Sequence, residues 1–262
     1  MLFRRIYFDS QMDVNLFDQL SYFNDYKFFS FNHSYTYKES SVQQSVTQFV
    51  DKYIEPFDEA KWLPKKAKER KITEQELKSE WELKAEISTT TGTHFHKFME
   101  ESLSGKEFTL RDTDVKDYLR EDVFSRYNVL INQGAKFIQD TRSTLFPVKT
   151  EFIVGYEDKI AGQIDALFYN KVSKSLEIYD WKTNKDIRCW NIWHNRMLPP
   201  FNNLEECELN TYSLQLSTYK SLLQKQGIPV GGLNIVWFNE KNKSYQVFPC
   251  KDLSNMVCDL LF

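Results

Sequence analysis

Asp165, Asp180 and Lys182 are residues of types that could bind a cation and stabilise an anion. They fall in the segments KIAGQIDALFY and SLEIYDWKT, which the sequence predicts to be two strands of one hairpin. If the turn is centred on residues 172 and 173, the numbers of paired residues sum to 345 and Asp165 lies opposite Asp180. Directly opposed side chains have Cβ atoms about 5 Å apart, a distance at which two carboxylates can converge on one divalent cation.

The alternation of side chains along a strand predicts that these residues share one face of the hairpin. In this register Gln163 faces Lys182, and the apolar neighbours on that face are Leu167, Tyr169, Leu176 and Ile178. Two carboxylates beside apolar residues repel each other, so we expect a cation between them, with Lys182 stabilising an anion or positioning a water molecule. An Asp-x-Lys triplet is also common on solvated strand faces. A turn different by one residue would place the two aspartates on opposite faces.

The segment TTTGTHFHKFMEESL contains a candidate nitrogen ligand. Thr91 or Thr93 can begin a helix here, and His96 and Glu100 then lie four residues apart on one helix face. A neutral imidazole can bind a metal ion through one ring nitrogen while its other nitrogen is held by an acceptor. A histidine beside an apolar stripe is also commonly a core residue. His94 permits a zinc site of the HxH type, but no third and fourth ligand follow at a matching spacing.

The remaining pattern predicts helices before residue 147 and a mixed sheet after it, hence an α/β fold. Helical spacing is found in residues 41–53, 73–88, 95–103 and 114–141, the last with Asp112 or Thr113 as a cap. Strands are predicted at residues 149–156, 159–169, 175–183, 231–238 and 244–249. Between them, Asn210 can cap a helix that ends at Gly227 and carries Gln215 one turn before Tyr219. This tyrosine is on the core-facing stripe of that helix, and the glutamine is at its edge.

Length and composition limit the class of protein. A chain of 262 residues, 41% hydrophobic and with only 8 Gly and 7 Pro, can bury a full core and is neither disordered nor collagen-like. Its 34 Lys and Arg against 37 Asp and Glu give a net charge of −3, which excludes binding of nucleic acid through bulk positive charge. This net charge is still compatible with a local basic groove around acidic catalytic groups. We expect one contiguous domain with three parts: residues 1–40 unassigned, 41–145 helical, and 146–262 an α/β core.

Four motifs, in chain order, resemble the motif set of the RecB-like nuclease branch of the PD-(D/E)XK superfamily. They are Gly92-Thr93-x-x-His96 with Glu100, Gly162-x-Ile164-Asp165, Asp180-x-Lys182-Thr183 and Gln215-x-x-x-Tyr219. Ahead of them, Ser45-Val46-Thr47 is similar to a segment found in mitochondrial genome maintenance exonuclease and its phage relatives. Together the matches span residues 45–219.

This resemblance implies a restriction-endonuclease-like core and a deoxyribonuclease that hydrolyses phosphodiester bonds with Mg²⁺ or Mn²⁺. By motif position, the metal ligands would be His96, Asp165, Asp180 and the main-chain carbonyl of Trp181. Lys182 would orient or deprotonate the attacking water. Gln215, Tyr219 and Thr183 would contact the DNA strand, and Glu100 and Glu151 would be outer ligands.

Some members of this branch carry an iron–sulfur cluster bound by one cysteine before the histidine motif and three near the C-terminus. Here all four cysteines follow residue 188 and no two have CxxC spacing; they are Cys189, Cys207, Cys250 and Cys258. We therefore predict no iron–sulfur cluster, and free thiols.

The leading expectation is a metal-dependent DNA exonuclease that acts on single strands or duplex ends. A flap-type, structure-selective endonuclease on the same core is the alternative enzyme, and a non-catalytic nucleic-acid-binding protein is the alternative of another class. Retention of Asp165, Asp180 and Lys182 argues against the last. The basic run at residues 65–71, with Lys65, Lys66 and Lys68, could belong to a helical roof that contacts DNA, or to a solvated helical flank.

Two features bear on location. No run approaches the roughly 18 apolar residues of a membrane span, and Asp9 and Asp13 interrupt the N-terminal segment before a signal sequence could build. We expect a soluble, cytoplasmic protein with no membrane partner. The similarity to phage relatives leaves open a phage-encoded protein that acts in the host cytoplasm.

Overall fold

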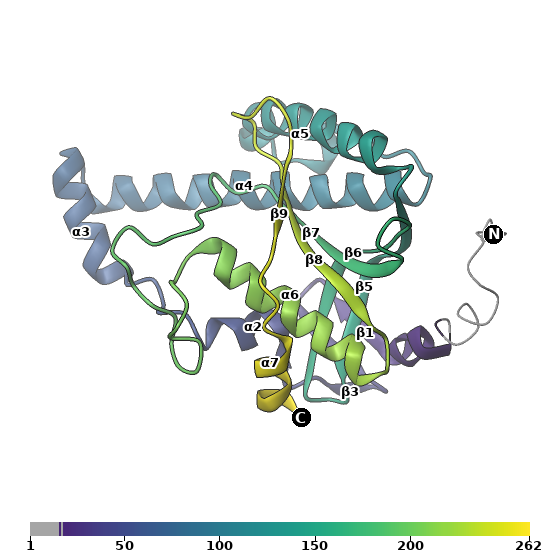
Figure 1. The fold of residues 1–262 in the computed structure, drawn as a ribbon. Coiled ribbons are helices and arrows are strands. Elements are labelled where there is room, and N and C mark those ends of the chain that lie inside the picture. Colours follow the sequence, from purple (N-terminus) through teal and green to yellow (C-terminus); the bar gives the residue numbers. More distant parts are fainter. Residues whose placement is uncertain (1–15, 17) are drawn as a thin grey trace.

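A mixed six-stranded sheet with helices on both faces forms the centre of the protein in this computed structural model, which describes residue 16 and residues 18–262 (Figure 1). Its strands are β4 (Gln44–Ser45), β5 (Leu145–Tyr156), β6 (Ile160–Asn170), β7 (Ser175–Lys182), β8 (Val230–Trp237) and β9 (Gln246–Pro249). β4 is parallel to β6 and β7 is parallel to β8, whereas the other pairs are antiparallel. The predicted α/β class with a mixed sheet is confirmed.

The predicted register of the β6–β7 hairpin is also confirmed, from the Asn170–Ser175 pair to the Ala166–Tyr179 pair. The ladder ends there, so the predicted pairs Asp165–Asp180 and Gln163–Lys182 are not part of it. Because β5 pairs with β6 along its whole length, β4 and β7 share the other edge of β6. On that edge, residues 162–165 lie between the part of β6 that pairs with β4 and the part that pairs with β7. Asp165 is at the end of this unpaired stretch.

Strict alternation of faces does not hold through Asp165. Ile164 and Leu167 are three residues apart but pack in the same core cluster, whereas Ala166 packs in the cluster on the other face. The β5–β6 pairing omits Glu151 and Asp165, which would lie opposite each other, and Glu151 has a left-handed backbone with φ of 46°. The expectation that Asp165 alternates regularly with its strand neighbours is therefore wrong, and the departure coincides with this irregularity of the β5–β6 pair.

Two layers of helices bury the two faces of the sheet. One face packs against α2 (Val46–Asp51), α6 (Glu208–Lys225) and α7 (Ser254–Leu261), and the other against α4 (Glu74–Leu103) and α5 (Arg120–Thr141). Leu214 and Leu222 of α6 and Phe95 and Met99 of α4 are fully buried in these layers. Burial of such side chains is the main stabilising term, at about 2 kcal/mol each. α3 (Glu59–Arg70) lies at the far end of α4 (Figure 1).

Some predicted helix boundaries are wrong. α4 is one helix through Gly92, although separate helices at 73–88 and 95–103 were expected from the run of threonines and glycine. Thr91 is completely buried, so tertiary packing offsets the weak helix propensity of this run. α5 begins at Arg120 after two 3-10 turns, Asp112–Asp114 and Asp117–Leu119, so neither proposed cap begins it. The N-cap of α6 is Cys207, and the Asn210 side chain donates to the Glu205 carbonyl oxygen.

The unassigned N-terminal region contains a small antiparallel sheet of β1 (Tyr26–Phe29), β2 (Ser34–Tyr37) and β3 (Ser40–Ser41). The 3-10 turn before β1, Tyr22–Asp25, packs on the large sheet through Phe23 and Phe152, whose ring centroids are 5.5 Å apart. Residues 1–15 and 17 lie outside the described part of the chain. Among the described helices, none combines the length and the apolar character that crossing a bilayer requires.

Candidate metal centre

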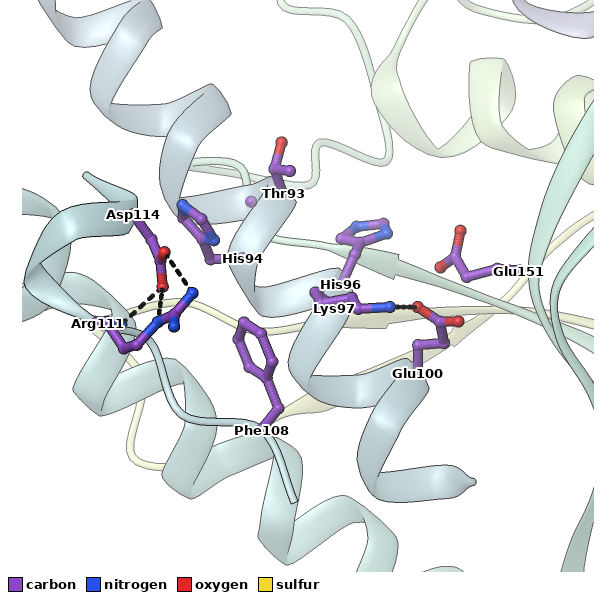
Figure 2. A pocket seen from close by; sticks show the side chains of 10 residues that line it. Thr93, His94, His96, Lys97, Glu100, Phe108, Arg111, Asp114 and Glu151 are labelled. Carbon is purple, nitrogen blue, oxygen red and sulfur yellow. Dashed lines mark hydrogen bonds and ion pairs between the residues drawn. The ribbon is translucent and has the colours of Figure 1, made fainter. Parts of the chain in front are cut away.

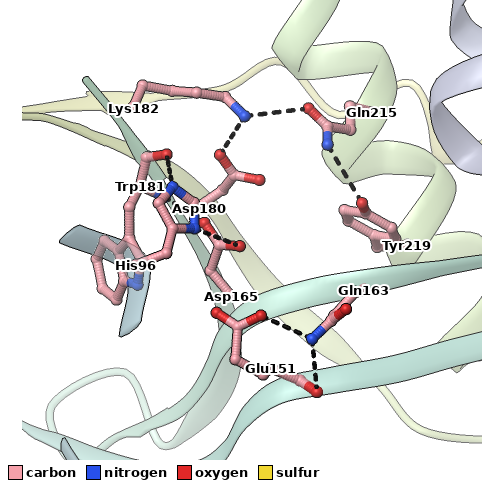
Figure 3. Close-up of polar contacts among 9 residues, drawn as sticks. All are labelled: His96, Glu151, Gln163, Asp165, Asp180, Trp181, Lys182, Gln215 and Tyr219. Carbon is pink, nitrogen blue, oxygen red and sulfur yellow. Dashed lines mark hydrogen bonds and ion pairs between the residues drawn. The ribbon is translucent and has the colours of Figure 1, made fainter. Parts of the chain in front are cut away.

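Three side chains from three different elements converge beside the end of the β6–β7 ladder. His96 of α4, Glu151 of β5 and Asp165 of β6 each offer one ligand atom, and these atoms lie within 4.8 Å of one another (Figure 3). Two of the three were predicted as ligands from sequence. Glu151, expected only as an outer ligand, is a full member of the group.

Asp165 is held in place by the backbone of β7. Its Oδ2 atom accepts a hydrogen bond of 2.6 Å from the Trp181 backbone N–H, and its Oδ1 atom lies 3.4 Å from His96 Nδ1. Burial alone would raise the pKa of this carboxyl group, but the His96 charge and hydrogen bond outweigh burial and lower it. Asp165 is therefore ionised and points one oxygen at the histidine.

Both ring nitrogens of His96 have partners. Nδ1 faces Asp165, and Nε2 lies 3.1 Å from the Trp181 carbonyl oxygen (Figure 3). Burial favours the neutral ring, yet the charge of Asp165 and its hydrogen bond raise the pKa of His96 to about 9. An imidazolium donates from both nitrogens, which matches two oxygen partners. The Trp181 carbonyl, predicted as a metal ligand, is in this structure the partner of the histidine.

Glu151 combines a strained backbone with an incompletely paired carboxyl group. A non-glycine residue at φ of 46° costs roughly 1–3 kcal/mol. Gln163 Nε2 donates to Glu151 Oε2 at 2.6 Å, while Oε1 is buried and has no hydrogen-bond partner in the described part of the chain. Burial, and next the charge of Asp165, raise the pKa of Glu151 to about 8.

This donor set fits a hard divalent cation. Two carboxylates and one imidazole within 4.8 Å of one another can bind the same ion, and oxygen-rich sets suit Mg²⁺ or Mn²⁺. The buried Oε1 atom of Glu151 is the observation that favours a cation, because an unpaired buried carboxyl oxygen is costly unless something positive binds it.

Asp180 belongs to a second, adjacent group rather than to these three. Its Oδ2 atom lies 2.6 Å from Lys182 Nζ, which is also 3.5 Å from Gln215 Oε1. The Gln215 amide in turn donates to the Tyr219 hydroxyl at 3.2 Å (Figure 3). Asp180 was predicted as a metal ligand; within the described chain it is the ion-pair partner of Lys182.

Lys182 is held as a cation. Burial opposes its charge, but Asp180 and then Asp165 raise its pKa above the ordinary value. Its ammonium also lies 4.6 Å from the centre of the Tyr212 ring, a cation–π contact that sequence analysis did not identify. Burial raises the pKa of Asp180 to about 6, against the opposing effect of Lys182. A charged lysine suits stabilising an anion or orienting water better than deprotonating water.

Tyr219, which was expected to contact the DNA strand, packs in the protein core. It is 3% exposed, and its Cε1 atom would lie 2.8 Å from a Cβ atom added at Gly162. Val46 Cγ2 would lie 2.7 Å from the same Cβ, and Ser45 caps α2 through a capping box with Gln48. The motif residues Gly162, Val46 and Tyr219 thus pack together, and the Tyr219 hydroxyl accepts the hydrogen bond from Gln215. Sequence spacing alone did not indicate this contact.

The other predicted site residues lie outside both groups. Glu100 pairs with Lys97 at 2.8 Å, and Thr183 Oγ1 lies near Gly92 at the close approach of β7 to α4. The three lysines of the basic run, Lys65, Lys66 and Lys68, are exposed on α3.

Ion pairs fix the distance of this basic run from the candidate site. Arg70 and Glu80 pair at 2.8 Å and hold α3 beside the first turns of α4. Glu80 precedes His96 by 16 residues, about 24 Å along a helix. The basic run therefore does not lie beside the candidate metal centre.

No protein-family model matches the chain, and no curated protein matches it in sequence.

Proposed function

We propose that this protein is a metal-dependent deoxyribonuclease with a PD-(D/E)XK core of the RecB-like branch, acting as an exonuclease on single strands or duplex ends. The observation that carries the proposal is the meeting of His96, Glu151 and Asp165 next to the Asp180–Lys182 ion pair. These residues come from four elements spread over 87 positions of the sequence. Their convergence is what a hydrolytic phosphodiesterase site would require.

The metal ligands in this proposal are His96, Glu151 and Asp165. A bound Mg²⁺ or Mn²⁺ supplies Lewis-acid chemistry: it lowers the pKa of water and neutralises charge on a scissile phosphate. Ligation requires His96 to be neutral and both carboxyl groups to be ionised, so binding releases protons. Gln163 fixes the Glu151 carboxylate, and the Trp181 N–H fixes Asp165.

The remaining groups act on the substrate side. Lys182, kept charged by Asp180, stabilises negative charge on the phosphate oxygens or orients the attacking water. Gln215 holds the lysine Nζ atom on its other side, and the Tyr219 hydroxyl holds Gln215. The side chains that bear on the reaction are therefore fixed before substrate binds, which favours catalysis.

The test is cleavage of end-labelled linear single-stranded DNA after exhaustive treatment with EDTA and again after adding Mg²⁺ or Mn²⁺. We expect no cleavage with EDTA, recovery with either ion, and products that shorten from an end. Full activity in EDTA would refute a metal-dependent nuclease. Asp165→Asn, which keeps the side-chain shape, is the matched variant and should stay inactive with either ion.

A further inference from the structure

A cavity of about 740 Å³ lies on the α4 side of the metal-binding group (Figure 2). Its walls are α4 around His94 and Lys97, and the segment after α4 that contains Phe108, Arg111 and Asp114. His96 and Glu151 line it as well, so the cavity and the candidate metal centre share two side chains. Ligand pockets in proteins are of similar size, about 300–1,000 Å³.

The cavity offers one aromatic ring and several hydrogen-bond donors. Phe108 is half-buried and its ring faces the space between His94 and Lys97 (Figure 2). The Arg111 side chain donates to Asp114 from Nε and Nη2, at 3.2 and 3.1 Å, which leaves three of its five N–H groups for a ligand. The His94 ring lies near Asp114 across the cavity (Figure 2). Glu100, Asp114 and Glu151 also line the cavity, and Lys97 and Arg111 are each paired with one of these carboxylates, so the wall itself carries no excess positive charge. A flat ring beside hydrogen-bond donors suits a planar ligand with acceptor groups, and a cation at the adjacent candidate metal centre would offset the charge of a phosphate.

The position of the cavity indicates which part of a DNA substrate it could bind. Lys182, Gln215 and Tyr219 lie on the α6 side of the candidate metal centre, whereas the cavity lies on the α4 side. A phosphodiester at His96, Glu151 and Asp165 would therefore have one nucleotide towards α6 and the other in the cavity.

We propose that this cavity binds the terminal nucleotide that is cleaved from the strand, with the base stacked on Phe108 and the phosphate or sugar bound by Arg111 and His94. The proposal rests on the nuclease function and adds the site of the leaving nucleotide to it. Aromatic stacking accepts any base, so the cavity would not select a sequence.

The experiment is a calorimetric titration of the full-length protein with thymidine 5′-monophosphate in a buffer that contains Ca²⁺. Phe108→Ala should weaken nucleotide binding on the order of tenfold, because stacking on one ring is lost. Phe108→Tyr should bind as the wild type does. Arg111→Ala should also weaken binding, and because Arg111 is exposed this variant keeps the test informative if Phe108→Ala folds poorly.

Phe31→Ala is the control, because Phe31 is 98% exposed in the turn between β1 and β2. It should leave nucleotide affinity unchanged. No binding by the wild type, or equal affinity in wild type, Phe108→Ala and Arg111→Ala, overturns the cavity assignment. If the wild type nevertheless cleaves DNA with added Mg²⁺ and not in EDTA, only this assignment fails; if it never cleaves, the proposed function itself fails.

Discussion

At the scale of single residues, we expect the protons on His96 and Glu151 to affect both the stability of the metal-free protein and its affinity for a cation. Asp165 raises the pKa of His96 from 6.5 to about 9 against the effect of burial, and burial raises that of Glu151 from 4.5 to about 8. The folded protein thus keeps protons that the unfolded chain loses. In EDTA, stability should fall as pH rises from about 4.5 to 8 through Glu151, and from about 6.5 to 9 through His96.

Thermal melts at pH 5, 7 and 9 in EDTA measure this effect, and we expect a fall in Tm on the order of 5 °C. Glu151→Gln is the matched control: it removes one titration, so its Tm should fall less across this range. Added Mn²⁺ should stabilise the wild type more at pH 8 than at pH 6, because ligation competes with protons. A Tm in EDTA that rises from pH 5 to 9 would contradict the proposed charge states.

The Asp180–Lys182 ion pair provides a second prediction at this scale. Lys182→Ala should reduce cleavage at least about 100-fold, because a preorganised charge at the phosphate is lost. It should also lower Tm, because Asp180, 3% exposed, loses its ion-pair partner.

The double variant Asp180→Asn/Lys182→Met separates these two effects. It removes both charges, so its Tm should be higher than that of Lys182→Ala, whereas its cleavage rate should stay as low. A double-mutant cycle, with Tm and cleavage rate measured for each variant, tests this. Cleavage by Lys182→Ala within tenfold of the wild type would show that the lysine is not part of the reaction.

At the scale of elements, close contact of β6 with α2 and α6 depends on Gly162. A Cβ atom there would lie 2.7 Å from Val46 Cγ2 and 2.8 Å from Tyr219 Cε1, so Gly162→Ala should destabilise the fold by about 1–3 kcal/mol. Gly92→Ala is the matched control, since its Cβ would meet only Thr183 Oγ1, at 3.3 Å, within a helix that favours alanine. Urea unfolding of both variants tests this. Equal stability of the two would contradict the packing described for β6.

The hairpin shows what could be predicted from sequence and what could not. Alternating strand patterns and a short polar turn fixed the β6–β7 register, and with it the neighbourhood of Asp165 and Asp180. The position of the Glu151 carboxylate depends on the left-handed backbone of Glu151 itself and on the pairing of β5 with β6. Neither feature has a local sequence signal. For this reason Glu151 was predicted only as an outer ligand, whereas in the structure its ligand atom lies within 4.8 Å of those of His96 and Asp165.

Helix α4 also shows which features could be predicted from the sequence and which could not. The spacing of His96 and Glu100 predicted one helix face correctly, and both residues line the cavity beside the candidate metal centre. The threonines and Gly92 before them predicted a break that tertiary contacts remove. Long-range packing, rather than local propensity, decides the helix at this point.

At the scale of the whole molecule, the length of α4 separates the basic run from the candidate active site. Lys65, Lys66 and Lys68 on α3 lie beside the far end of α4, so they could contact only DNA several nucleotides from the scissile bond. Neutralising all three should weaken binding of single-stranded DNA and reduce the slope of log K against log salt by up to about 2. Mn²⁺ affinity should not change. A salt slope equal to that of the wild type would assign α3 to a solvated flank.

The requirement for a free end is a further prediction at this scale. An exonuclease should degrade linear single-stranded DNA and leave a covalently closed circle of the same sequence intact. Gel analysis of both substrates after equal times measures this. Equal rates on circle and line would exclude an exonuclease and favour the flap-type endonuclease.

The affinity of the protein for Mn²⁺, measured by electron paramagnetic resonance at pH 8 in the wild type and in Glu151→Gln, tests the metal centre most directly. Because His96, Glu151 and Asp165 are the proposed ligands, the loss of one carboxylate should weaken Mn²⁺ binding at least tenfold. Wild-type binding that Glu151→Gln leaves unchanged, or no Mn²⁺ binding by the wild type at millimolar concentrations, would contradict a metal centre at these three residues.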